Sequence, residues 1–113
     1  MNRDESCPTV DNVIDLERAL AGSPRVVAMI YVTWCPYCRK ALPVFEKQRL
    51  AGADNLLLVI DDEERIADLY GIDVFPTLVL FEKGMIVKRL DGKPGLGLNE
   101  TQIADFVSSC AKL

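Results

Sequence analysis

An uninterrupted apolar run leads directly into two cysteines, and this junction constrains the fold more than any other part of the chain. The run covers residues 26–32, and the cysteines are Cys35 and Cys38. Continuous apolar runs of this length are typical of strands buried on both faces of a sheet. The segment after Cys35 can form a helix, and Pro36 suits the first turn because its missing N–H would have no partner there. The junction therefore predicts a buried strand followed by a helix that begins at the first cysteine.

The spacing of the two cysteines predicts a reversible disulfide. Helical residues three apart have Cβ atoms about 5–6 Å from each other, and a disulfide needs about 3.5–4.5 Å, so a small local adjustment closes the bond. Free N–H groups and the macrodipole at the helix start stabilise a thiolate on Cys35, which is the attacking species in disulfide exchange. Arg39 and Lys40 add positive charge nearby. We expect Cys35 to attack a substrate and Cys38, one turn further in, to resolve the mixed disulfide.

Two motifs together resemble the thioredoxin superfamily, and the resemblance covers nearly the whole chain. The first is Trp34-Cys35-Pro36-Tyr37-Cys38 after a buried strand, and the second is Val74-Phe75-Pro76-Thr77, which opens the apolar run 78–81. Thioredoxin-like proteins place a cis-proline before such a strand, facing the two sulfurs, so the resemblance implies a cis Phe75–Pro76 bond. It also implies a surface that docks an extended substrate peptide. The residues expected on this surface are Trp34, Pro36, Tyr37, Phe75, Pro76 and Gly92.

Ordinary structural roles are the alternatives for several of these residues. Trp34, Tyr37 and Phe75 can equally serve as packing aromatics. Gly92 can be a plain turn glycine. The docking role of each residue therefore depends on how exposed it is in the folded chain.

The rest of the chain predicts an α/β protein of thioredoxin fold, with a central mixed β-sheet of four to five strands flanked by helices on both faces. The expected strands cover 7–10, 25–32, 55–60, 77–82 and 85–90. One helix should follow a cap at Asp11 or Asn12, and the last should follow Asn99, which forms a capping box with Gln102. Two further helices are expected over 36–51, with Pro43 inside, and over 63–70. A single domain is expected over 1–113, with residues 1–6 flexible.

Two features depart from typical thioredoxins. The residues between the cysteines are Pro36 and Tyr37, which is the pair found in glutaredoxins. Thioredoxins also bury an Asp and a Lys that assist the resolving cysteine, and by register these positions are Met29 and Leu57 here. We therefore expect a more oxidising disulfide than that of thioredoxin and name no general base for Cys38. Against a true glutaredoxin, the chain after Pro76 has no evident Gly-Gly-Asp-like glutathione-binding element.

Charge and composition limit the kinds of partner that this chain is expected to bind. The 113 residues carry a formal charge of −4 without a basic stripe, so neither nucleic acid nor an anionic membrane is an expected partner. No apolar run approaches the roughly 20 residues that span a bilayer. The polar N-terminus lacks the apolar core of a signal peptide, so a cytoplasmic location is expected, although a chain trimmed of its leader would look the same. Histidine is absent, which excludes its use in catalysis or metal binding.

The predicted function is that of a monomeric thiol–disulfide oxidoreductase acting on disulfide-containing proteins. No bound cofactor is expected, and electrons should come from a thioredoxin-type reductase or from glutathione. Glutathione-dependent, glutaredoxin-like reduction is an alternative, and so is a metal-binding, iron–sulfur-binding or redox-inactive module. Structural zinc usually takes four ligands, and only Cys7 and Cys110 remain. Cys7 is expected in an exposed segment and Cys110 on the apolar face of the last helix.

Overall fold

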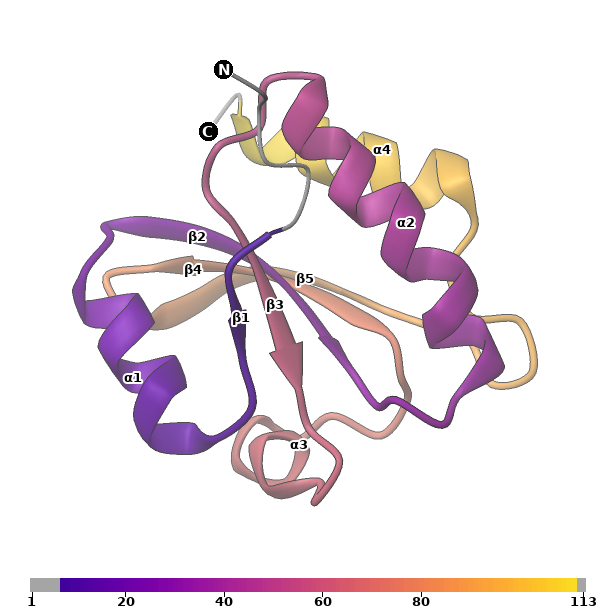
Figure 1. Ribbon diagram of the computed structural model, residues 1–113, viewed down its shortest axis with the longest axis horizontal. Helices are drawn as coiled ribbons and strands as arrows, with labels where there is room; N and C mark the ends of the chain where they lie inside the picture. Colours follow the sequence, from indigo (N-terminus) through magenta and orange to yellow (C-terminus); the bar gives the residue numbers. More distant parts are fainter. Residues whose placement is uncertain (1–6, 112–113) are drawn as a thin grey trace.

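The computed structural model describes residues 7–111, so the expected flexibility of residues 1–6 lies outside the described part of the chain. Five strands and four helices follow one another along it, alternating up to β4, which is followed directly by β5 (Figure 1). The strands are β1 (Thr9–Val10), β2 (Arg25–Tyr31), β3 (Leu56–Ile60), β4 (Thr77–Glu82) and β5 (Met85–Asp91). The helices are α1 (Val13–Ala21), α2 (Pro36–Leu50), α3 (Arg65–Tyr70) and α4 (Glu100–Ala111). None of these helices is long and apolar enough to cross a membrane.

The strands form one mixed sheet in the order β1-β3-β2-β4-β5. The first three in this order run parallel to one another, whereas β4 and β5 pair antiparallel to their neighbours. Helices α1 and α3 cover one face of the sheet, and α2 and α4 cover the other (Figure 1). The predicted fold, a mixed sheet flanked by helices on both faces, is confirmed.

The two faces of the sheet build two separate cores, because successive side chains of a strand point to opposite sides. In β2, Val27, Met29 and Tyr31 join the core under α2 and α4, which we call the α2/α4 core. Val26, Ala28 and Ile30 join the core under α1 and α3, the α1/α3 core. Strand β2 is therefore buried on both faces, as its apolar run predicts.

Local capping and turn signals are confirmed in detail. The side chain of Asn12 accepts a hydrogen bond from the backbone N–H of Asp15 at 2.8 Å and caps α1. Asn99 and Gln102 bond to each other's backbone N–H at 2.8 and 2.9 Å, which completes the predicted capping box before α4. The β4–β5 hairpin turns through Lys83 and Gly84, both with positive φ, as a type I′ turn requires.

Three expectations need correction. Helix α3 begins at Arg65, later than predicted, because the carboxylate of Asp61 accepts the backbone N–H groups of its first turn. Cys7 is buried in the α2/α4 core, since the parallel pairing of β1 with β3 brings the segment over the sheet. Leu57 points into the α1/α3 core, away from Cys38, and the strand partner of Met29 is the equally apolar Leu58.

Helix α2 continues through Pro43, although this residue cannot donate the usual backbone hydrogen bond. On the face of α2 that meets the sheet, Phe45 is fully buried, and Leu42 and Val44 pack partly against the same core. The side chain of Leu50 lies outside the described part of the structure.

Candidate functional site

The two cysteines lie where β2 ends and α2 begins. Cys35 is the N-cap residue of α2, with extended backbone angles of φ −86° and ψ 122°, and Pro36 occupies the first helical turn. The carbonyl of Cys35 accepts the N–H of Arg39 at 3.1 Å, so the helical hydrogen bonds start at the first cysteine. Both cysteines are free thiols. The sequence junction thus folds as predicted, with Cys35 half-buried at the helix start and Cys38 one turn further in.

The second cysteine is held in a protected environment. Only 1% of its surface is exposed, and it packs in the α2/α4 core. Burial raises the pKa of the Cys38 thiol from 9.0 to about 12, and a hydrogen bond and charge interaction with Cys35 act in the same direction. A hydrogen bond with the backbone of Val32 lowers this pKa but does not outweigh burial. Cys38 is therefore a protonated thiol in contact with the sulfur of Cys35.

Aromatic residues surround the accessible sulfur. Trp34 exposes 55% of its surface, and Tyr37 is also exposed. Phe75 is half-buried and contacts both cores. The Phe75–Pro76 peptide bond is cis, as the resemblance implied. Exposure of Trp34 and Tyr37 favours a docking role for these two over a packing role, whereas Pro36 lies exposed between them and Pro76 is buried.

Gly92 is explained by contacts within the fold. Its N–H donates to the carbonyl of Pro76 at 3.0 Å. A Cβ atom at this position would lie 2.6 Å from the same carbonyl oxygen, which is too close for any side chain. Gly92 itself is buried, so it fixes the loop against Pro76.

The loop that follows Gly92 lies beside Tyr37, a contact that the sequence does not indicate. Gly97 has a φ of +67°, and a Cβ atom there would lie 2.7 Å from the Cβ of Tyr37. Two backbone hydrogen bonds join Lys93 and Gly97 and close the loop. Leu96 at its tip exposes 73% of its surface. The same glycine-rich segment also contains Leu98, which is buried, and the sequence does not indicate which of the two leucines is exposed.

The two predicted cations are exposed on the first turns of α2. The Nε of Arg39 donates to the carbonyl of Thr33 at 3.2 Å, so the guanidinium folds back over the turn before Cys35. Among residues 7–111, no hydrogen bond joins Arg39 or Lys40 to the sulfur of Cys35. Any effect of these residues on the thiolate would therefore act through the electrostatic field.

Two acidic residues after β3, Asp61 and Asp62, contact the end of β2 and the turn before Cys35, and the sequence does not indicate these contacts. Asp61 is buried and donates its N–H to the carbonyl of Tyr31 at 2.8 Å. Asp62 accepts two hydrogen bonds from Thr33, the second residue before Cys35. These contacts could have been expected from the parallel pairing of β2 with β3, which places residues after β3 next to residues after β2.

The remaining two cysteines lie in the same core as Cys38. Cys7 and Cys110 are both buried in the α2/α4 core and form no disulfide within residues 7–111. Burial raises the pKa of the Cys110 thiol above its usual value, with Lys88 and Arg25 opposing the shift. Within residues 7–111, no group of three or more cysteine or acidic side chains could hold a metal ion.

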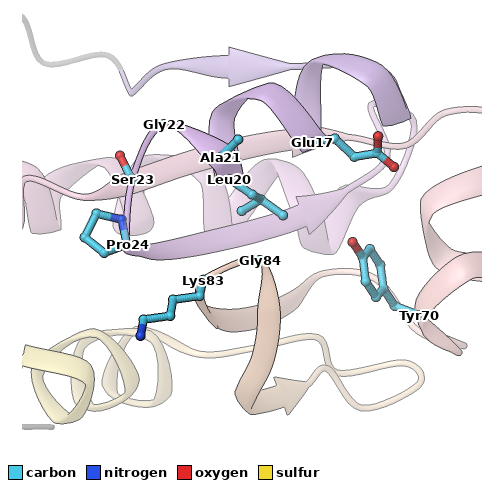
Figure 2. A pocket seen from close by; sticks show the side chains of 9 residues that line it. All are labelled: Glu17, Leu20, Ala21, Gly22, Ser23, Pro24, Tyr70, Lys83 and Gly84. Carbon is cyan, nitrogen blue, oxygen red and sulfur yellow. The ribbon is translucent and has the colours of Figure 1, made fainter.

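A surface hollow of about 660 Å³ lies between α1 and the β4–β5 turn (Figure 2). It reaches Pro24 just before β2, at the end of this strand opposite to the cysteines. Figure 2 shows Lys83 extending away from Glu17 and Tyr70. The polar groups that line the hollow therefore do not converge on one point, as they would in a site built for a small molecule.

Comparisons with known proteins agree with this geometry. The family model described as Thioredoxin matches residues 10–109. A thioredoxin of Alicyclobacillus acidocaldarius is 32% identical over 96 residues, which cover 82% of this chain and 91% of that protein. A mutant thioredoxin from Halobacterium salinarum superposes with a TM-score of 0.75 at 27% identity, covering 100% of this chain and 97% of that one.

A thioredoxin of Malassezia sympodialis superposes with a TM-score of 0.78 at 24% identity, covering 96% of this chain and 94% of that one, and supports the fold alone. The family match spans nearly all of the described residues and includes both cysteines of the junction. The chain therefore belongs to the thioredoxin family and is a thiol–disulfide oxidoreductase.

Proposed function

We propose that Cys35 and Cys38 carry the disulfide chemistry in two steps. The thiolate of Cys35 attacks one sulfur of a substrate disulfide, forms a mixed disulfide and releases the other substrate sulfur as a thiolate. Cys38 then loses its proton and attacks the sulfur of Cys35, which releases the second substrate sulfur. The substrate gains two electrons, and the protein is left with a Cys35–Cys38 disulfide. The observation that supports these roles is the unequal exposure of the two sulfurs.

The same arrangement suggests how Cys38 is activated without a dedicated base. In the reduced protein, burial raises the pKa of the Cys38 thiol, and Cys35 raises it further by a hydrogen bond and by its charge. Once Cys35 is part of a mixed disulfide its sulfur is neutral, so both effects of Cys35 are removed. Burial still raises the pKa of Cys38 at this stage, but the hydrogen bond with Val32 then favours the thiolate without opposition from Cys35. Mixed-disulfide formation itself thus prepares the resolving thiol.

The docking surface in this proposal consists of the predicted residues together with Leu96. Trp34, Tyr37 and Leu96 are exposed apolar groups. Within residues 7–111, the backbone of Phe75 makes no hydrogen bond to other backbone groups, so it is available to an extended peptide. Backbone pairing of this kind supplies affinity, and adjacent apolar side chains supply selectivity. In this proposal Pro36, Pro76 and Gly92 shape the surface, and Arg39 and Lys40 favour the thiolate of Cys35.

The glutaredoxin-type pair Pro36-Tyr37 and the apolar Met29 support a more oxidising disulfide. Met29 is fully buried in the same core as Cys38, so no carboxylate occupies that position. Reduction potentials are about −270 mV for thioredoxin and about −200 to −230 mV for glutaredoxins. We expect a value nearer the second range.

In this proposal the protein works as a monomer with no bound cofactor. A reducing, cytoplasmic setting fits electrons supplied by a thioredoxin-type reductase or by glutathione. Insulin reduction with the two donor systems, each used alone, distinguishes them. Turnover with glutathione alone would indicate the glutaredoxin-like activity.

The roles of the two cysteines are tested by single substitutions. With a disulfide-bonded protein substrate, Cys38→Ser should accumulate a mixed disulfide through Cys35, whereas Cys35→Ser should form none. Cys7→Ser and Cys110→Ser are matched controls that should turn over like the wild type. Trapping of substrate by Cys35→Ser would reverse the assigned roles.

A further inference from the structure

The turn that carries Trp34 and Cys35 is held by a side chain from a neighbouring strand end. Asp62 lies two residues beyond β3, and Thr33 lies two residues beyond β2. The two strands are parallel, with Tyr31 opposite Ile60. Because both chains leave the sheet at the same edge and in the same register, the two side chains meet. This contact joins residues 29 positions apart in the sequence.

Both oxygens of the Asp62 carboxylate contact the same residue. Oδ1 accepts the backbone N–H of Thr33 at 2.8 Å, and Oδ2 accepts its hydroxyl at 2.8 Å. The third polar group of Thr33, its carbonyl, accepts the Nε of Arg39 at 3.2 Å. Every hydrogen-bonding group of Thr33 is thus engaged, although the residue itself is exposed.

The backbone that carries Asp62 is itself held in place by hydrogen bonds of the preceding residue. Asp61, the preceding residue, accepts the N–H groups of Ile66 and Ala67 at 2.9 and 2.7 Å and donates its own N–H to Tyr31. The carboxylate of Asp62 therefore projects from a backbone that is tied both to α3 and to the end of β2.

We propose that Asp62 is a positioning residue, which holds the Thr33–Trp34 turn by a two-point contact and so fixes Trp34 and Cys35 for substrate docking. This inference rests on the proposed function of Cys35. Exposed polar contacts add little to global stability, so the effect of Asp62 should appear mainly in the position of the turn. Small displacements of reacting groups can lower rates by up to about a hundredfold.

The substitutions separate position from charge. Asp62→Asn removes the charge but keeps an oxygen that can accept the N–H of Thr33 and an amide that can donate to its hydroxyl. Asp62→Ala removes the contact. Thr33→Ser keeps both hydrogen bonds, and Thr33→Val keeps only the backbone one. Glu63→Gln is the matched control, because Glu63 is the adjacent carboxylate and pairs only with the exposed Arg65 among the described residues.

Trp34 is the only tryptophan in the chain, so its fluorescence reports on this turn. We expect Asp62→Ala to lower the fluorescence anisotropy of Trp34 and to reduce kcat/KM for a disulfide-bonded protein roughly tenfold, mainly through KM. Asp62→Asn, Thr33→Ser and Glu63→Gln should stay within about twofold of the wild type, with Thr33→Val between the two groups. Urea unfolding midpoints should differ little among all five.

Wild-type anisotropy and kcat/KM in Asp62→Ala would overturn the proposal, and so would equal impairment in Asp62→Asn and Asp62→Ala, since the charge rather than the contact would then be responsible. Failure of the proposed function is distinguishable from these outcomes. In that case the wild type itself would not reduce the substrate, while the anisotropy comparison would still measure the contact.

Discussion

The two cores on either side of the sheet are built from the same strands but differ in chemistry. The α2/α4 core contains Cys7, Cys38 and Cys110, and Cys35 packs at its edge. The α1/α3 core contains no cysteine among the described residues and consists mainly of aliphatic side chains with Phe81. Both are equally well buried, so hydrophobicity does not separate them. The difference arises from α2, which begins at the half-buried Cys35 and covers only one face of the sheet.

This comparison assigns different roles to the two faces. The α2/α4 core should control both stability and the reactivity of Cys38, because it supplies the apolar surroundings that keep the thiol protonated. The α1/α3 core should support the sheet without affecting sulfur chemistry. Substitutions on the two faces test whether the cores act independently or as one unit.

The largest expected effect concerns the protonation of Cys38. In Cys35→Ser, burial still raises the pKa of the Cys38 thiol, because burial is the largest cause of the shift and does not depend on Cys35. A raised pKa means that the thiol stays protonated at neutral pH, so its thiolate fraction, and with it alkylation by iodoacetamide, should be more than about tenfold below that of a free cysteine. The rate should rise as the pH is raised above neutrality. The reciprocal variant Cys38→Ser, which leaves Cys35 half-exposed, is the control. Comparable rates at pH 7 in the two variants would contradict the protected environment.

Core truncations should separate the two faces directly. Phe45 in the α2/α4 core and Leu16 in the α1/α3 core are both fully buried. We expect Phe45→Ala to lower the free energy of unfolding by about 3–5 kcal/mol and Leu16→Ala by about 2–5 kcal/mol in urea titrations. Only Phe45→Ala should accelerate alkylation of Cys38, measured in a Cys35→Ser background.

The control for these truncations is Ile14→Ala, since Ile14 is exposed on the same helix as Leu16 and should change stability by about 0.5 kcal/mol or less. Equal acceleration of Cys38 alkylation by Leu16→Ala would show that the cores are coupled.

A smaller effect is expected from the exposed leucine beside the site. Leu96→Ser should lower kcat/KM for a disulfide-bonded protein about fivefold, which corresponds to losing about 1 kcal/mol of partial apolar burial. Leu69→Ser is the matched control, because Leu69 is also exposed but lies on α3, on the other face of the sheet. Similar losses in both variants would remove Leu96 from the docking surface.

The smallest effects should come from the helix caps, one for each face. Asn12→Ala removes the cap of α1, and Asn99→Ala disrupts the capping box of α4. Each should cost about 1 kcal/mol in the free energy of unfolding. Neither should alter the alkylation rate of Cys38, because both asparagines are exposed and neither belongs to the core that surrounds Cys38. Circular dichroism during urea unfolding measures the first quantity and mass spectrometry the second.

Features encoded by neighbouring residues were predictable from the chain alone. The Asn99–Gln102 capping box and the Lys83-Gly84 turn depend on side chains and backbone angles within three or four positions. The start of α3 was misplaced for a related reason. The N–H groups of its first turn bond to the side chain of Asp61, which lies four residues before Arg65 and reaches the helix only through the turn between them.

Features that join distant segments were not predictable in this way. The sequence predicts an exposed Cys7 because its own segment is short and polar, and only the pairing of β1 with β3 buries it. The contact between Gly97 and Tyr37 likewise depends on where the loop after β5 meets the start of α2.

The sequence by itself determined the strand and helix order, the pair of cysteines at a helix start and the family to which the chain belongs. These follow from apolar periodicity and from residue chemistry over a few positions. Only the tertiary structure decided that Cys38 is sealed in one of two cores, that Asp62 contacts Thr33 and that Leu96 is exposed beside Tyr37. The physical reason is that burial and cross-strand hydrogen bonds depend on strand order and register, which bring together residues far apart in the chain.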